Sequence, residues 1–209
     1  MILDVATNFL TCYASARRDA DAAYKAIIAA YGRRKVRYAR FDNAPELIAA
    51  CEEHRIPFET SAPYIHQTNG LIESHNRIEL YGGKASFEQC GAPLCFWPLA
   101  LAHFAFSRNL YPVGNSQESA YEKRFGEGPF NGIRAPFFAR VRFRPLPPDE
   151  DNKYVHRVQP NMVYGVFVGW VLAPGGKFTG RYKCTDLSEF INMDLRVGGH
   201  IRIQEVFEV

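Results

Sequence analysis

The chain has 209 residues, of which 47% are hydrophobic and 22% are charged, and its formal net charge is +3. This composition is typical of a globular protein and excludes a disordered chain. No apolar stretch is long enough to span a membrane and no signal peptide is visible, so we expect a soluble, intracellular protein. The five cysteines form no Cys-x-x-Cys pair, which argues against a structural zinc site and a disulfide framework.

The first part of the chain alternates short strands with helices. Two strands are predicted within residues 1–14, joined near Ala6–Asn8, and alanines and tyrosines at helical spacing predict a helix over Asp19–Tyr31 that ends at Gly32. A strand over Val36–Phe41, a helix over Pro45–His54 and a strand over Ile56–Thr60 follow. This alternation predicts a mixed α/β fold.

A loop over Ser61–Thr68 leads into a helix that Asn69 can cap and that Gly82–Gly83 should end. The next helix covers Ala92–Asn109, and Pro98 either kinks it or marks its true start. We expect its aromatic residues Trp97, Phe104 and Phe106 to be core, with a nucleic-acid stacking platform as the alternative. A short helix is predicted over Glu118–Phe125.

Composition changes after a break rich in glycine at Gly126–Gly132. The remaining strand candidates are Phe137–Arg144, Met162–Leu172, Gly180–Cys184 and Ile201–Val209. We therefore expect a core over residues 1–130 and a small β-rich domain over residues 131–209.

Two carboxylates stand out by their local context. Asp42 follows a predicted strand directly, and Glu73 lies in the first turn of a predicted helix. Metal-assisted phosphoryl transfer needs carboxylates that converge on divalent cations, and Mg²⁺ prefers oxygen ligands. We therefore expect both acids to meet at one edge of a sheet.

The helix of Glu73 carries two further polar residues on the same face. Asn76 and Arg77 lie three and four residues after Glu73. A basic residue one turn from a metal-binding acid can hold a phosphate, although the alternative is an ordinary surface pair between Glu73 and Arg77.

The positive charge is concentrated in two acid-free runs. One run comprises Arg33, Arg34, Lys35, Arg37 and Arg40, and the other comprises Arg134, Arg140, Arg142 and Arg144. Such clusters can bind a polyanion such as nucleic acid, or they can be ordinary solvated surface.

At these residues the chain resembles the integrase catalytic core of long-terminal-repeat retrotransposons, and it is most similar to the copia type. The resemblance rests on Asp42-Asn43, on Pro63-Tyr64, Gln67 and Asn69-Gly70, on Glu73 with Asn76 and Arg77, on Asn109-Leu110-Tyr111-Pro112, on Ser119-Ala120-Tyr121-Glu122 and on Val166-Phe167-Val168-Gly169-Trp170. It covers most of the chain, and the segment that leads to Glu73 is its most specific part.

The resemblance implies an RNase H-like fold, in which helices flank a mixed sheet of five strands, and a metal-dependent activity that trims DNA ends and joins them to target DNA. It implies Asp42 and Glu73 as ligands of Mg²⁺ or Mn²⁺ and as catalytic residues, and it implies that Tyr64, Gln67, Asn69, Asn76 and Arg77 contact nucleic acid. The implied partners are element ends and target DNA, with a homo-oligomer on the DNA and no membrane. The implied location is the nucleus or a virus-like particle.

The family has a further catalytic Asp on the first strand of its sheet. Asp4 aligns with the strand after that one, so we expect Asp4 to be a turn residue and the missing acid and strand to lie upstream of Met1. A copy that lacks this Asp would hold at least one metal ion poorly, so both an active and an inactive enzyme stay open as alternatives. The alternatives are a non-catalytic nucleic-acid-binding module derived from an integrase, and another RNase H-like nuclease or transposase. His66 and His75 flank Glu73. We expect His66 to be a loop residue and His75 to pack or cap, with assistance to metal binding or proton transfer as the alternative.

Overall fold

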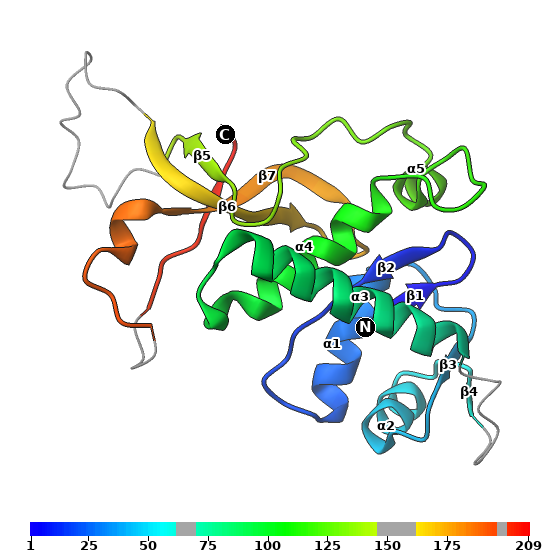
Figure 1. Cartoon of the computed structure of the whole chain (residues 1–209). Helices are drawn as coiled ribbons and strands as arrows, with labels where there is room; N and C mark the ends of the chain where they lie inside the picture. The colour runs from blue at the N-terminus through cyan, green and yellow to red at the C-terminus, as the bar shows by residue number, and fades with distance from the viewer. Residues whose placement is uncertain (62–69, 146–161, 196–199) are drawn as a thin grey trace. The chain divides into compact units, whose positions relative to one another are not determined.

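The computed structural model describes residues 1–61, 70–145, 162–195 and 200–209. Within them the fold is mixed α/β, with helices and three separate sheets (Figure 1). The chain forms two compact units. Unit 1 comprises residues 1–82, 105–130 and 172–177, and unit 2 comprises residues 83–104, 131–171 and 178–209.

Unit 1 begins with an antiparallel hairpin of β1 (Ile2–Asp4) and β2 (Phe9–Thr11), in which Leu3 pairs with Leu10. The turn between them places Asn8 at a φ of 59°, a conformation that asparagine tolerates better than most residues. The hairpin confirms the two strands predicted for the start of the chain. Phe9 and Leu10 are buried and form part of the core of unit 1.

Helix α1 (Ala20–Tyr31) follows the hairpin as predicted. The side chain of Asp19 accepts a hydrogen bond from the backbone N–H of Ala22 at 2.8 Å, which caps the start of the helix. Gly32 ends the helix with a φ of 61°, and its N–H donates to the Ile28 carbonyl. Ala30 is buried on this helix.

Two short strands, β3 (Ala39–Phe41) and β4 (Phe58–Thr60), pair in parallel, and α2 (Pro45–Glu53) connects them. Pro45 suits the first turn of α2 because proline has no N–H to leave unpaired there. The predicted strand over Val36–Phe41 is thus shorter than expected. The four strands of unit 1 form two separate pairs in the described residues.

Helix α3 (Gly70–Cys90) is longer than predicted, because it does not end at Gly82–Gly83. Gly83 is buried, and a Cβ atom there would overlap the side chain of Leu101 on α4 (Trp97–Asn109). This glycine therefore permits close packing of two helices and does not terminate one. A single 3₁₀ turn, Leu94–Phe96, precedes α4, so Pro98 stands in the first turn of the helix and marks its start. Of the aromatic residues expected in the core, Phe106 is buried, whereas Trp97 is 53% exposed, so that prediction was wrong for Trp97.

Helix α5 (Ala120–Phe125) completes the helices of unit 1. Ser119 and Glu122 form a capping box: the Glu122 N–H donates to the Ser119 hydroxyl at 3.1 Å, and the Ser119 N–H donates to the Glu122 carboxylate at 2.8 Å. The rings of Phe106, Tyr121 and Phe130 pack edge to face around this helix. Ser119 and Glu122 therefore have a structural role, which is to cap the start of α5.

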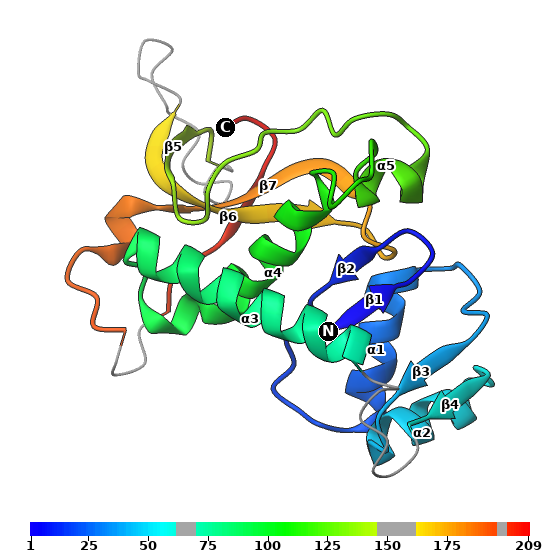
Figure 2. The same ribbon diagram turned by 45° about the vertical axis from the view of Figure 1, so that its right-hand side comes forward.

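Unit 2 contains a four-stranded sheet in the order β5 (Arg140–Phe143), β6 (Val163–Leu172), β7 (Phe178–Asp186) and β8 (Gln204–Val206) (Figure 2). The pairs β5–β6 and β7–β8 are antiparallel. Val166 and Val168 of β6 are buried with Phe137 and with Ala92, Phe96 and Ala100. The β-rich end of the chain is confirmed, and the boundary at residue 130 stays a prediction.

Candidate active site at the β3–β4 edge

Asp42 lies at the carboxyl end of β3. Phe41 and Thr60 are register partners in the parallel pair, and the Ser61 N–H donates to the Phe41 carbonyl at 3.0 Å, so the ladder continues to this edge. Asp42 comes directly after the ladder, and its carbonyl accepts a hydrogen bond from the Ala44 N–H at 2.7 Å. Asp42 is exposed, whereas Ala44 is buried and starts α2. The strand therefore delivers an exposed carboxylate to the sheet edge.

Glu73 is reached from the same edge. Parallel strands end on one side of their sheet, and the chain leaves β4 at Thr60 on the side where β3 leads to Asp42. It next forms α3, whose first turn carries an exposed Glu73. In Figures 1 and 2 the start of α3 lies on the side of unit 1 that carries β3 and β4. Asp42 therefore lies at the carboxyl end of β3, and Glu73 lies in the first turn of the helix that follows β4 in the chain, while their meeting at one metal ion stays a prediction.

Asn76 and Arg77 are both exposed on α3, in the turn after Glu73. With a spacing of three and four residues, they share the helix face of Glu73. An exposed carboxylate, amide and guanidinium on one face can hold a cation and a phosphate group next to each other. The other three residues implied by the resemblance, Tyr64, Gln67 and Asn69, lie outside the described residues, as does His66.

His75 has a packing role, as predicted. Its Nδ1 lies 2.9 Å from the Leu71 carbonyl, and its Nε2 lies 3.2 Å from both the Asn8 side-chain oxygen and a guanidinium nitrogen of Arg108. Arg108 also donates to the Asn8 carbonyl at 3.4 Å. These contacts hold α3 against the turn of the β1–β2 hairpin.

Glu79 is a buried acid that the sequence did not single out. It is 3% exposed, and burial raises the pKa of its carboxyl group, which favours the protonated form. Burial and the neighbouring Glu79 together raise the pKa of Cys12 to about 12, so this thiol stays protonated. The row of Ile72, His75 and Glu79 on α3 faces inward, opposite to Glu73, and that helical spacing is the signal that could have identified it.

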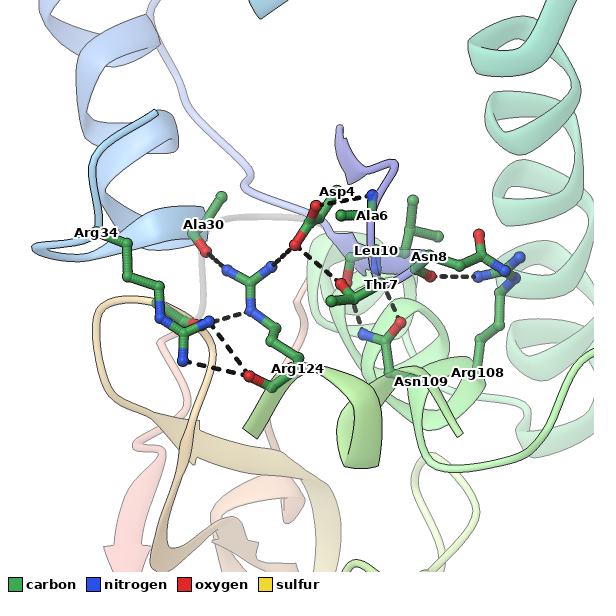
Figure 3. Close-up of polar contacts among 11 residues, drawn as sticks. Asp4, Ala6, Thr7, Asn8, Leu10, Ala30, Arg34, Arg108, Asn109 and Arg124 are labelled. Atoms are coloured by element: carbon green, nitrogen blue, oxygen red, sulfur yellow. Dashed lines mark hydrogen bonds and ion pairs between the residues drawn. The ribbon is translucent and has the colours of Figure 1, made fainter. Parts of the chain in front are cut away.

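Asp4 is held in a buried network with Arg124 (Figure 3). One oxygen of Asp4 accepts from the Arg124 guanidinium at 2.8 Å and from the Thr7 hydroxyl at 2.9 Å, and the other accepts from the Ala6 N–H at 3.1 Å. The Arg124 side chain is 1% exposed, and it also donates to the carbonyls of Ala30 and Gly175.

These contacts give Arg124 the neutralising partner and the acceptors that a buried guanidinium needs. Its guanidinium carbon also lies 4.6 Å from the centre of the Phe9 ring. Asp4 is therefore a structural residue of unit 1: it ends β1, and its carboxylate accepts from Ala6 and Thr7 of the turn that was predicted there.

Asn109, which belongs to one of the motifs that carry the resemblance, has a structural role. Its side-chain nitrogen donates to the Leu10 carbonyl at 2.7 Å, and its side-chain oxygen accepts from the Leu10 N–H at 2.8 Å (Figure 3). Asn109 is fully buried. The amide thus replaces the donor and acceptor of a neighbouring strand at β2 and satisfies both backbone groups of Leu10.

Among the residues that the structure describes, no three histidine, cysteine, aspartate or glutamate side chains gather closely enough to hold a metal ion. The predicted pairing of Asp42 with Glu73 at one metal ion stays a prediction. Within the same described residues, no helix is long and apolar enough to cross a membrane.

The sequence matches no protein-family model and no curated protein. Among solved structures, the fold is similar to a chain in the cryo-EM structure of the simian T-cell lymphotropic virus intasome in complex with PP2A regulatory subunit B56 gamma. The TM-score is 0.49 at 16% sequence identity, and the alignment covers 98% of this chain and 67% of that chain.

Proposed function

We propose that the chain is an RNase H-like catalytic core of the integrase type, closest to that of copia retrotransposons, which processes DNA ends and joins them to target DNA. The supporting observation is the order of the elements: β3 and β4 run in parallel, Asp42 follows β3, and the helix of Glu73 follows β4 in the chain. Both carboxylates are exposed. They offer the oxygen donors that Mg²⁺ and Mn²⁺ accept.

In this proposal each residue has a separate task. Asp42 and Glu73 hold the metal, which when bound neutralises charge on the phosphoryl group and lowers the pKa of an attacking oxygen. Arg77 and Asn76 bind a DNA phosphate from the same face of α3. Tyr64, Gln67 and Asn69 orient the DNA end from the segment before α3. The expected partners are element ends and target DNA in a homo-oligomer, in the nucleus or in a virus-like particle.

A second candidate function is a non-catalytic nucleic-acid-binding module derived from such an enzyme. The observation that favours it is the engagement of Asp4 by Arg124, which leaves this acid in a structural role. Two carboxylates hold divalent metal less completely than three. In that case the basic surfaces would bind DNA, and the chemistry would be lost.

The experiment compares the parent chain with the double variant Asp42→Asn/Glu73→Gln. Both substitutions keep the side-chain shape and remove the negative charge. We expect Mn²⁺ affinity, measured by calorimetry, to fall at least about tenfold, which corresponds to ~1.4 kcal/mol. End cleavage and strand transfer on labelled DNA in Mg²⁺ or Mn²⁺ should disappear in the variant.

The matched control is Glu88→Gln, because Glu88 is an exposed acid on the same helix. It lies fifteen residues after Glu73, or about 22 Å along the helix axis at 1.5 Å per residue. Equal Mn²⁺ affinity in all three proteins would refute the metal site. DNA binding that survives the double substitution, in a parent with no turnover, would establish the non-catalytic candidate instead.

A further inference from the structure

A cleft of about 480 Å³ lies in unit 1 between the end of α1 and the end of α2, and neither Asp42 nor Glu73 lines it. We name it the α1–α2 cleft. Its walls are the last two turns of α1, the segment Gly32–Val36 and the segment His54–Ile56. This volume is within the range of small-ligand sites in proteins, about 300–1,000 Å³.

The lining of the α1–α2 cleft is strongly cationic. It contains Arg33, Arg34, Lys35 and Arg55, and no carboxylate from the described residues lines it. The nearest acids on α2, Glu52 and Glu53, are exposed and lie outside the lining. Four like charges around one concavity repel each other and create a positive potential that a bound anion would relieve.

Ordinary helix capping does not account for this charge. Cations are favoured at the ends of helices because the carbonyl groups there carry partial negative charge, about half an elementary charge for each helix. The ends of α1 and α2 together therefore neutralise about one of the four cations. The remaining positive charge requires counter-ions or a ligand.

The partners of Arg34 leave its charge uncompensated. Both terminal nitrogens of its guanidinium donate to the Arg124 carbonyl at 3.4 Å, and its central carbon lies 5.4 Å from the centre of the Phe125 ring. A carbonyl and an aromatic ring are neutral groups. They orient the guanidinium without cancelling its charge, so Arg34 is a preorganised cation at the cleft.

Arg55 occupies a position where glycine is usual. It follows the last turn of α2 with a φ of 53°, and the Ile56 N–H donates to the Cys51 carbonyl at 2.8 Å behind it. Such a left-handed residue at a helix end is most often glycine, because other side chains are strained there. Here the backbone position instead carries a guanidinium into the lining of the cleft.

One wall of the cleft is a flat aromatic stack. The rings of Tyr24 and His54 are nearly parallel, with centres 3.3 Å apart and an angle of 12° between their planes. Both residues line the cleft. A flat ring beside several cations suits a ligand that combines phosphate with a planar or sugar group.

We propose that the α1–α2 cleft binds the phosphate groups of a nucleotide or nucleic acid. Arg33, Lys35 and Arg55 contact the phosphate oxygens from exposed positions, Arg34 provides an oriented guanidinium, and the ring stack supports the rest of the ligand. The site needs neither Asp42 nor Glu73 and no divalent metal. This proposal can therefore be tested independently of the proposed catalytic function.

The test uses the full chain in EDTA and compares two double variants that remove the same charge. The cleft variant is Arg33→Ala/Lys35→Ala. The control variant is Arg17→Ala/Lys123→Ala, which removes two exposed cations of unit 1 that do not line the cleft. Circular dichroism first establishes that both variants are folded, which we expect because all four side chains are exposed.

The probes are a fluorescein-labelled 16-base-pair DNA duplex, followed by anisotropy from 50 to 200 mM salt, and ATP and pyrophosphate, followed by calorimetry. We expect the cleft variant to bind the duplex at least about tenfold more weakly at 100 mM salt, with a salt slope lower by about 1.8, since each lost phosphate contact contributes about 0.9. The control variant should change affinity less than about twofold.

The probes also distinguish the two sources of phosphate. If ATP and pyrophosphate bind the parent and lose affinity in the cleft variant, the ligand is a nucleotide. If only the duplex shows the difference, the ligand is the backbone of a nucleic acid. If the cleft and control variants bind every probe equally well, the cleft is not a phosphate site and the proposal is wrong.

Discussion

His103 is a buried histidine of unit 2, with 6% of its surface exposed. Its ring stacks on Trp170 with centres 4.8 Å apart, and its Nε2 lies 2.9 Å from the Ala135 carbonyl, to which it can donate. Burial lowers the pKa of this histidine from 6.5 to about 4, because the charged form loses its solvation. The native protein therefore holds His103 in its neutral form at neutral pH.

This burial predicts that the protein loses stability as the pH falls from 6.5 towards 4. In that range the unfolded chain protonates His103 and the native state does not, so protons favour unfolding. The difference between the two pKa values corresponds to ~3 kcal/mol once the pH lies below both. We expect the urea midpoint to fall between pH 7.5 and pH 4.5, and to fall less in His103→Gln, whose amide can still donate to Ala135. An equal fall in both proteins would contradict this role.

Local sequence was informative about single residues only where their partners are also local. Asp19, Gly32 and the Ser119–Glu122 pair act within one turn of their own helix, and their spacing identifies them. Asp4 could be recognised as a turn residue from its neighbours, but its partner Arg124 is 120 positions away along the chain. No spacing rule predicts such a pair, because the packing of the whole unit creates it.

Gly165 in β6 is the clearest case in which an element depends on a missing side chain. A Cβ atom there would overlap the Thr185 carbonyl and the ring of Phe143, and Phe143 is fully buried. We expect Gly165→Ala to lower the free energy of unfolding by about 1–3 kcal/mol, because a backbone carbonyl cannot move aside as a flexible side chain can. Urea unfolding of the purified chain measures this.

The matched substitution is Gly70→Ala at the start of α3, where a Cβ atom would meet nothing within 4 Å. This change should leave stability unchanged or raise it by up to ~1 kcal/mol, since alanine favours a helix more than glycine does. If both substitutions changed the free energy of unfolding equally, the close packing at Gly165 would not contribute to stability.

Helices and strands were predicted well where the apolar residues recur at a regular spacing, and less well where a glycine was interpreted as the end of a helix. The alternation of Arg140, Arg142 and their apolar neighbours predicted β5, and the structure places it beside β6. Gly82 and Gly83 suggested the end of α3, but the helix continues to Cys90. A glycine can serve helix packing or helix termination, and the sequence alone does not say which contact it makes.

The site illustrates the same limit at the scale of the whole molecule. The strand before Asp42 and the helix of Glu73 could be predicted separately, but their sequence positions do not show how far apart the two carboxylates lie. The α1–α2 cleft could not be predicted, although the basic run over Arg33–Lys35 was visible. Its fourth cation, Arg55, follows the end of α2, and only the packing of α1 on α2 brings the four charges around one cleft.

The two compact units do not follow the chain order, which leads to a prediction for the boundary near residue 130. Unit 2 includes residues 83–104, and its buried cluster combines Ala92, Phe96 and Ala100 from that segment with Val166 and Val168 of β6. A fragment of residues 131–209 lacks the first three and would expose the last two to water. We therefore expect this fragment alone not to unfold cooperatively, because the apolar surface that stabilises the sheet is missing.

Adding a peptide of residues 83–104 to that fragment should restore a cooperative thermal transition, since the peptide supplies the missing half of the cluster. A peptide with Phe96→Ala is the control, and it should restore less, because loss of a buried phenylalanine costs about 3–5 kcal/mol. If residues 131–209 instead unfold cooperatively without any peptide, the sheet is a domain in its own right, and the segment over residues 83–104 contributes packing that the sheet does not need.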